Sequence, residues 1–221
     1  MNIYLISNNL VLNDITYESD IVLEEKRTSR PLSIEGEELA KRISEIISAQ
    51  NIYSSNYASA LATAKYIANK NNTIIKIDKR LNDSKIGVLG RHNIKMLRYM
   101  QEKNFDYKFD GGESLNDTSN RMNSIFKSII KDVDDDVVIV THKRAMLALL
   151  LKHCEQGLNL DERLILSYNN KVILDDTEND CDIIKIEIED KKVKNVDFLE
   201  NLWKNTRCFQ WRGKKYGKNN W

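Results

Sequence analysis

The chain has 221 residues, a length that suits one α/β domain with a sizeable core and leaves little room for a second domain. Its 34 Lys and Arg nearly balance 33 Asp and Glu, and a net charge of +1 argues against nucleic-acid binding along the whole length. No apolar run approaches the roughly 20 residues that a membrane span needs, and the start shows no secretion signal. We therefore expect a soluble cytoplasmic protein without a membrane partner.

The cysteine pattern gives no sign of a disulfide framework or a metal centre. The three cysteines, Cys154, Cys181 and Cys208, are odd in number and far apart in the sequence. There is no CxxC pair, and no histidine lies at metal-ligand spacing from any of them. We expect no bound metal and no cofactor.

The first third of the chain alternates strand-like and helical segments. Residues 2–6 form a short, mostly apolar run that predicts a buried strand ending in a polar turn. The stretch up to about residue 30 has no clear period, so a loop with one short helix is expected. Ser33 is suited to cap a helix whose first turn is acidic. The further predicted elements here are a strand at 51–54, a helix at 58–69 and a strand at 73–77.

The rest of the chain continues the same alternation. The predicted helices are 93–102, 113–131 and 144–153, and the predicted strands are 137–140, 171–174, 182–188 and 193–198. Strands that alternate with helices indicate a largely parallel sheet covered by helices on both faces. Ligands of such sheets bind beyond the carboxyl ends of the strands. This rule selects two segments, Ser7-Asn8-Asn9 and Thr141-His142-Lys143-Arg144.

Six motifs in a fixed order carry a resemblance to a known family. They are Leu5-Ile6-Ser7-Asn8-Asn9, Pro31-Leu32-Ser33 with Gly36 and Ala40, Tyr53-Ser54-Ser55 with Ala60-Leu61-Ala62-Thr63-Ala64, Arg80-Leu81-Asn82-Asp83, Gly111-Gly112-Glu113-Ser114-Leu115, and Val138-Ile139-Val140-Thr141-His142. Across about residues 1–200 they resemble the phosphoglycerate mutase-like branch of the histidine phosphatase superfamily. The resemblance implies a three-layer α/β/α fold with a mostly parallel central sheet. It also implies phosphoryl transfer through a phosphorylated histidine.

The positions that would carry this chemistry are altered. Asn8 stands where the family has its nucleophilic histidine, and an amide nitrogen has no free lone pair with which to attack phosphorus. Ser7 and Ser59 stand where the family has two phosphate-clamping arginines, which removes two fixed charges and their forked hydrogen bonds. By analogy with removal of other catalytic nucleophiles, the first change alone predicts a rate loss on the order of 10⁴ to 10⁶.

Two of the family's functional positions keep a suitable residue type. His142 matches the second histidine, and Asp83 stands in place of the usual acidic glutamate, so these two are the candidate catalytic residues. Lys143 and Arg144 follow His142 at a predicted helix start, where they would return positive charge to an anion site. The predicted ligand-binding residues are Ser7, Asn8, Ser59, His142, Lys143 and Arg144. Each of these residues also has a purely structural interpretation. Ser7-Asn8-Asn9 would be a plain polar turn, and His142 would be a remnant whose hydrogen bonds are satisfied within the fold. Asp83 would be an ordinary loop residue, and Lys143 and Arg144 would be solvated cations.

The chain divides into a domain at 1–200 and a basic, aromatic tail at 201–221. The tail contains six Lys and Arg, no acid, and five aromatic residues between the cations. Cations interleaved with aromatic rings can bind single-stranded nucleic acid or an anionic partner surface. The alternative is that the rings pack back on the domain while the lysines stay in water.

Three functional hypotheses follow. The first is a catalytically impaired phosphatase-like protein that binds a phosphorylated small molecule or a protein partner, and that can form a homodimer. The second is an enzyme with altered chemistry, in which His142 is a general base and Lys143 or Arg144 holds phosphate. The third is nucleic-acid or partner binding through the tail, residues 203–221.

Overall fold

The computed structural model describes residues 1–8, 10–12, 20–160, 162–175 and 181–199. The side chain of Asn8 lies outside the described part, although its backbone is within it. The basic, aromatic tail also lies outside, so the hypothesis of nucleic-acid or partner binding there stays a prediction.

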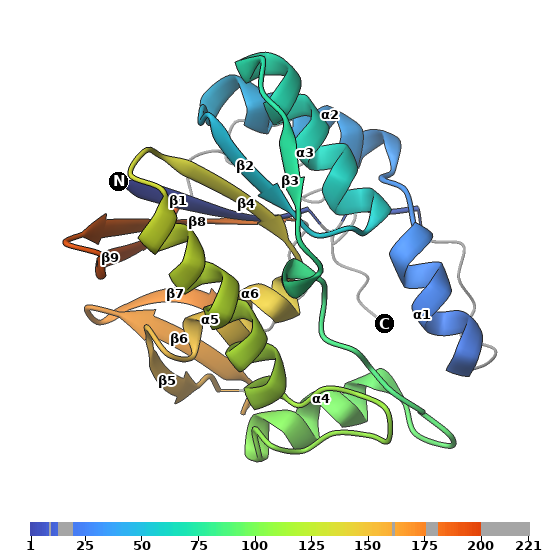
Figure 1. Cartoon of the computed structure of the whole chain (residues 1–221). Coiled ribbons are helices and arrows are strands. Elements are labelled where there is room, and N and C mark those ends of the chain that lie inside the picture. The colour runs from blue at the N-terminus through green and yellow to red at the C-terminus, as the bar shows by residue number, and fades with distance from the viewer. Residues whose placement is uncertain (9, 13–19, 161, 176–180, 200–221) are drawn as a thin grey trace, which may run out of the picture.

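The centre of the molecule is a six-stranded sheet with the strand order β3-β2-β4-β1-β8-β9 (Figure 1). Its strands are β1 (Asn2–Asn8), β2 (Asn51–Ser54), β3 (Ile75–Ile77), β4 (Val137–Thr141), β8 (Cys181–Glu189) and β9 (Lys192–Phe198). The first four run parallel, and β8 pairs antiparallel with both β1 and β9. The mostly parallel sheet predicted from the alternation is confirmed. Its two central strands, β1 and β4, end side by side at Ser7 and Thr141.

Helices cover both faces of this sheet, as expected for three layers (Figure 1). One face packs on α2 (Ile34–Ile46) and α3 (Ala58–Asn71) through Ile6, Ile52 and Val140. The other packs on α5 (Leu115–Asp132) and α6 (Lys143–Leu150). All five residues of β4 are buried, because this strand is covered on both faces. The two cores hold the strand ends rigidly, which is what a ligand site at that edge requires.

Polar side chains cap several helix starts, and the cap at Ser33 was predicted from the sequence. Ser33 accepts a hydrogen bond from the backbone N–H of Gly36 at 3.1 Å. Ser114 forms a reciprocal capping box with Asp117 at the start of α5. Asn93 caps α4 (Ile94–Lys103) through the N–H of Met96.

Glycines allow two chain segments to cross beside the site. Gly87 has a φ of +79°, a left-handed conformation that glycine adopts without strain. A Cβ on Gly112 would lie 2.6 Å from the carbonyl oxygen of Ile86, so only glycine fits there. The crossing fixes the loop that follows the 3₁₀ turn η1 (Lys79–Leu81), and this loop carries Asp83.

A second, antiparallel sheet lies on the side of α5 and α6, and only its last strand was predicted. It consists of β5 (Glu155–Leu158), β6 (Leu164–Tyr168) and β7 (Lys171–Asp175). β5 has no alternating pattern and is mostly exposed, so its sequence carries little strand signal. The helix expected at 144–153 was too long, since α6 ends at Leu150 and a turn leads into β5.

The described residues before position 30 include the helix α1 (Asp20–Ser29), which agrees with the short helix expected in this stretch. In Figure 1 it lies beside the carboxyl ends of the parallel strands. None of the helices in the described part is long and apolar enough to cross a membrane.

Candidate ligand pocket

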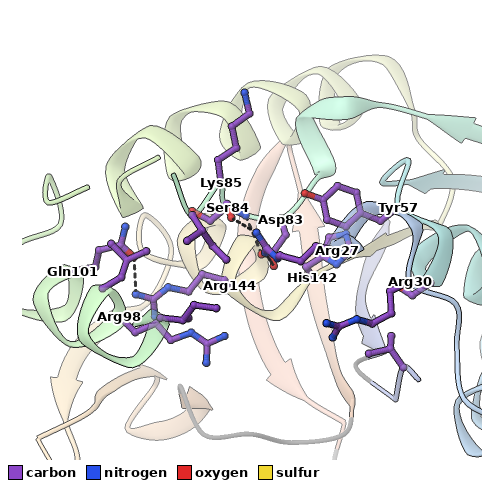
Figure 2. A pocket seen from close by; sticks show the side chains of 15 residues that line it. Arg27, Arg30, Tyr57, Asp83, Ser84, Lys85, Arg98, Gln101, His142 and Arg144 are labelled. Carbon is purple, nitrogen blue, oxygen red and sulfur yellow. Dashed lines mark hydrogen bonds and ion pairs between the residues drawn. The ribbon is translucent and has the colours of Figure 1, made fainter. Parts of the chain in front are cut away.

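A cavity of about 220 Å³ opens near the carboxyl end of β4, in the region that the strand order selects. Its side chains come from α1, α3, α4, α6 and the loop after η1 (Figure 2). Five of them are basic: Arg27, Arg30, Lys85, Arg98 and Arg144. Among the described lining residues, Asp83 is the one with an acidic side chain. The cavity is therefore chemically suited to an anion.

His142 is placed by the junction between β4 and α6, where it is the residue before the first helical turn. Its Nε2 lies 2.8 Å from the Oγ of Ser55, and its ring centroid lies 4.5 Å from that of Tyr57. Burial lowers the pKa of His142 to about 4, against the smaller opposing effect of Asp83. The imidazole is consequently neutral near pH 7.

Ser55 holds His142 in a defined orientation. Its hydroxyl accepts from the N–H of Tyr57 at 3.1 Å and lies 3.2 Å from the Oδ1 of Asn82, to which it can donate. When Ser55 donates to Asn82, Nε2 of His142 donates to Ser55, and the imidazole lone pair lies on Nδ1. Through Ser55, Asn82 thus determines which ring nitrogen of His142 is basic.

Asp83 lines the cavity as an ion-paired carboxylate. It pairs with the guanidinium of Arg27, and its other oxygen accepts from the N–H of Ser84 at 2.9 Å. Burial alone would raise the pKa of Asp83, but the charge of Arg27, followed by that of His142, holds it below its usual value. An ionised carboxylate in this state is poorly suited to protonating a leaving group at neutral pH.

Helix α1 is fastened across this edge by polar contacts. Arg27 also bonds Glu24 at 2.9 Å and the carbonyl of Ser84 at 3.2 Å. Glu24 in turn accepts from the hydroxyl of Tyr57 at 2.7 Å. Neither Arg27 nor Arg30 was singled out from the sequence. The sequence shows only that both are basic residues at the end of a stretch without a clear period. It does not show that their side chains point toward the cavity.

The predicted site residues do not all reach the cavity. Ser59, Asp83, His142 and Arg144 line it. Ser7 is fully buried in β1, in register with Thr141 and Asp182, and is not among the lining residues described. Asn8 ends β1, but its side chain lies outside the described part.

Lys143 and Arg144 are adjacent in sequence, yet they have different partners. The Nζ of Lys143 lies 3.2 Å from Asp182 and 3.8 Å from Asp175, and Lys143 is not among the described lining residues of the cavity. Arg144 faces the cavity and donates to Gln101 Oε1 at 3.1 Å. Successive helical residues point about 100° apart, which explains why one cation faces the ligand space and the other the sheet.

A buried carboxylate stands behind Arg144. The side chain of Glu102 has no exposed surface and accepts three hydrogen bonds of 3.0–3.1 Å from Arg163. It also lies 4.0 Å from Arg144. This network joins α4 and the start of β6 to the cavity wall. In the described ranges, no group of three or more His, Cys, Asp and Glu is arranged to hold a metal ion.

The sequence profile of the histidine phosphatase superfamily (branch 1) matches residues 23–189, more than half of the chain. The chain belongs to the histidine phosphatase superfamily. The matched range begins after β1, so positions 7 and 8 lie outside it. The family assignment therefore depends on the part of the chain that contains Asp83 and His142. It does not depend on the altered residues 7 and 8 at the end of β1.

Solved structures of the family show the same fold at low identity. A native mycobacterial glucosyl-3-phosphoglycerate phosphatase is 15% identical, with a TM-score of 0.61 and coverage of 90% of this chain and 96% of that one. The complex of that mycobacterial phosphatase with inorganic phosphate is 17% identical, with a TM-score of 0.57 over 68% and 77%. The α-ribazole phosphatase of Shigella flexneri is 16% identical, with a TM-score of 0.60 over 88% and 94%. No curated protein sequence matches this chain significantly.

Proposed function

We propose that this family member binds a phosphorylated small molecule in the cavity and does not form a phosphohistidine. One combination carries the proposal: arginines from three helical segments line the cavity beside His142, while position 8 has a carboxamide instead of an imidazole. Arginine's planar fork matches the oxygens of a phosphate group. A cavity of about 220 Å³ lies below the roughly 300–1,000 Å³ typical of drug-sized ligands, so it suits a compact molecule.

The surviving residues fit recognition better than phosphoryl transfer. Neutral His142, with its Nε2–H directed at Ser55, can accept a hydrogen bond from the ligand at Nδ1. Asp83 orients Arg27 and stays ionised, so a leaving group has no acid poised beside it at neutral pH. Without a nucleophile to accept the phosphoryl group, these contacts hold a phosphate ester in its ground state.

The test combines binding and turnover on the full-length chain. Titration calorimetry with inorganic phosphate and with orthovanadate is expected to show binding. Hydrolysis of p-nitrophenyl phosphate is expected to stay at the level of His142→Ala. Asn8→His serves as the informative variant, since it restores an imidazole at the nucleophile position and is expected to gain one phosphoryl group in intact-mass analysis. A phosphorylated side chain trapped in the unaltered protein during turnover would overturn the proposal.

A second candidate function is an enzyme that uses His142 as a general base. The observation in its favour is that burial keeps this imidazole neutral, which is the state a base needs. A screen of phosphate esters at pH 7 tests it: turnover by the unaltered chain that His142→Ala abolishes would support it. Activity that is equal in both proteins would dismiss it.

A further inference from the structure

The loop that carries Asp83 is held from behind by an ion pair that the site description has not used. Arg121, on α5, donates at 2.8–3.4 Å to three backbone carbonyls of this loop, those of Arg80, Asn82 and Asp83. The carboxylate of Glu113 accepts from the same guanidinium at 2.6 and 2.8 Å. The two side chains are only 19% and 17% exposed. Neither Arg121 nor Glu113 is among the described residues that line the cavity.

Glu113 also holds the far end of the same loop. Its Oε2 accepts from the backbone N–H of Lys85 at 3.0 Å, and its own backbone N–H donates to the carbonyl of Lys85 at 2.9 Å. The capping box at Ser114 fixes the chain directly after Glu113. A guanidinium that is bonded to a carboxylate through two nitrogens is a rigid donor. The pair therefore fixes the backbone of the loop between residues 80 and 85.

Asn82 is the loop residue that contacts the hydrogen bonds of the histidine. The backbone N–H of Asn56 donates to its Oδ1 at 3.1 Å, which assigns this atom as the oxygen of the amide. An amide oxygen only accepts, so the Oγ of Ser55, 3.2 Å away, is the donor in that contact. The hydroxyl of Ser55 has one hydrogen and cannot donate to Nε2 of His142 at the same time.

The two neutral tautomers of His142 consequently differ by one hydrogen bond. With the proton on Nε2, His142 donates to Ser55 and Ser55 donates to Asn82. With the proton on Nδ1, Ser55 donates to His142, and no hydrogen is left for Asn82. One net hydrogen bond corresponds to a population ratio of roughly fivefold. This preference requires that Asn82 stay within reach of Ser55, and 3.2 Å is already a long contact for a hydroxyl donor.

We propose that Arg121 and Glu113 are a positioning pair, which holds Asn82 against Ser55 and thereby keeps the lone pair of His142 on Nδ1, where a ligand can donate to it. Because neither residue is among the described lining residues, both act through the loop and not by contact with the ligand. The role of the pair in ligand binding rests on the proposed function, whereas its effect on the tautomer does not.

The tautomer can be measured by ¹⁵N NMR on the ligand-free, full-length chain with labelled histidines. A protonated and an unprotonated ring nitrogen have different chemical shifts, and the signals of His142 are those that disappear in His142→Gln. We expect the Nε2–H form to predominate at pH 7. Arg121→Met should raise the share of the Nδ1–H form at least twofold. Arg121→Lys should give an intermediate share, since lysine keeps the charge but has no forked donor.

Asn82→Ala removes the acceptor itself and should change the tautomer in the same direction as Arg121→Met. Adding Arg121→Met to Asn82→Ala should then change it no further, because both substitutions act through one contact. The matched control is Arg80→Met, which alters the same loop but leaves its backbone carbonyl available to Arg121. It should leave the tautomer unchanged. An unchanged tautomer in Arg121→Met, or an equal change in Arg80→Met, would overturn the proposal.

Titration calorimetry with inorganic phosphate separates this proposal from the proposed function. Phosphate at pH 7 carries a proton that it can donate to Nδ1 of His142. Arg121→Met should weaken phosphate binding at least threefold, and Arg80→Met by less than twofold. An altered tautomer with unchanged affinity would overturn the role of the pair in ligand binding. Absence of phosphate binding by the unaltered chain would overturn the proposed function, while the NMR comparison would still decide whether the pair sets the tautomer.

Discussion

The arginines that neighbour the cavity form two groups, and the difference separates scaffold from recognition. Arg27, Arg144 and Arg163 each have a carboxylate or amide partner on another segment, so they hold α1, α6 and the second sheet in place. Arg30 and Arg98 have no such partner in the described part and face open space. Removing a member of the first group should change stability, and removing one of the second should change binding.

The largest expected loss of stability follows from Glu102→Ala. This carboxylate is fully buried and serves both Arg163 and Arg144. Its removal takes the carboxylate away from two cations, and breaking buried pairs in this way destabilises by about 3–5 kcal/mol. We expect about 3 kcal/mol in urea unfolding, because Arg163 is 35% exposed and recovers some hydration. Glu189→Ala, at an exposed pair with Lys194, should change the unfolding free energy by less than about 1 kcal/mol.

Arg27→Ala should have the next largest effect. It leaves Asp83 charged and unpaired at the cavity wall and releases α1 from Ser84. Because both side chains keep some exposure, 15% and 20%, we expect about 2 kcal/mol, below the range for fully buried pairs. A double-mutant cycle with Asp83→Asn checks the assignment. If the double variant is no more stable than Arg27→Ala, the ion pair is not the cause.

The pH dependence of stability should report on His142. Its pKa falls from 6.5 in the unfolded chain to about 4 in the folded one, so the unfolded chain takes up the proton first as pH decreases. Stability is therefore complete above about pH 6.5 and decreases toward pH 4, by an amount on the order of 3 kcal/mol.

His142→Asn should reduce this slope in urea titrations at a series of pH values. Burial also lowers the pKa of His153, so part of the slope will remain. Asp83 contributes to the pH dependence at lower pH than His142. Because its pKa is lowered, its protonation decreases the free energy of unfolding only below about pH 4. An unchanged slope in the asparagine variant would show that His142 is hydrated in the folded protein.

The smallest expected change in stability is that of Arg98→Ala. No described residue depends on this guanidinium for a hydrogen bond, and its electrostatic attraction to Asp83 is weaker than that of Arg27. The unfolding free energy should change by no more than about 0.5 kcal/mol, which urea unfolding can resolve. A loss above 1 kcal/mol would place Arg98 in the scaffold group instead.

Local patterns were sufficient for most of the elements. The capping residue Ser33, the apolar run at 137–140 and the alternation of strands with helices correctly indicated the central sheet and its helices. The strand β5 was missed because its side chains are mostly exposed and leave no period. The sequence also could not predict which basic side chains face the cavity. Neighbouring residues 143 and 144 carry like charges, and only their directions on α6 separate them.

By itself, the sequence determined the family, the edge of the sheet at which the ligand site lies, and the absence of an imidazole at position 8, because these depend on order and chemical type. The tertiary structure decided which charges are neutralised. Ion pairing joins residues far apart in the chain, such as Arg27 with Asp83 and Arg163 with Glu102, and side-chain direction sets the rest. The arginines that have no bonded partner among the described residues can be identified only from the tertiary structure.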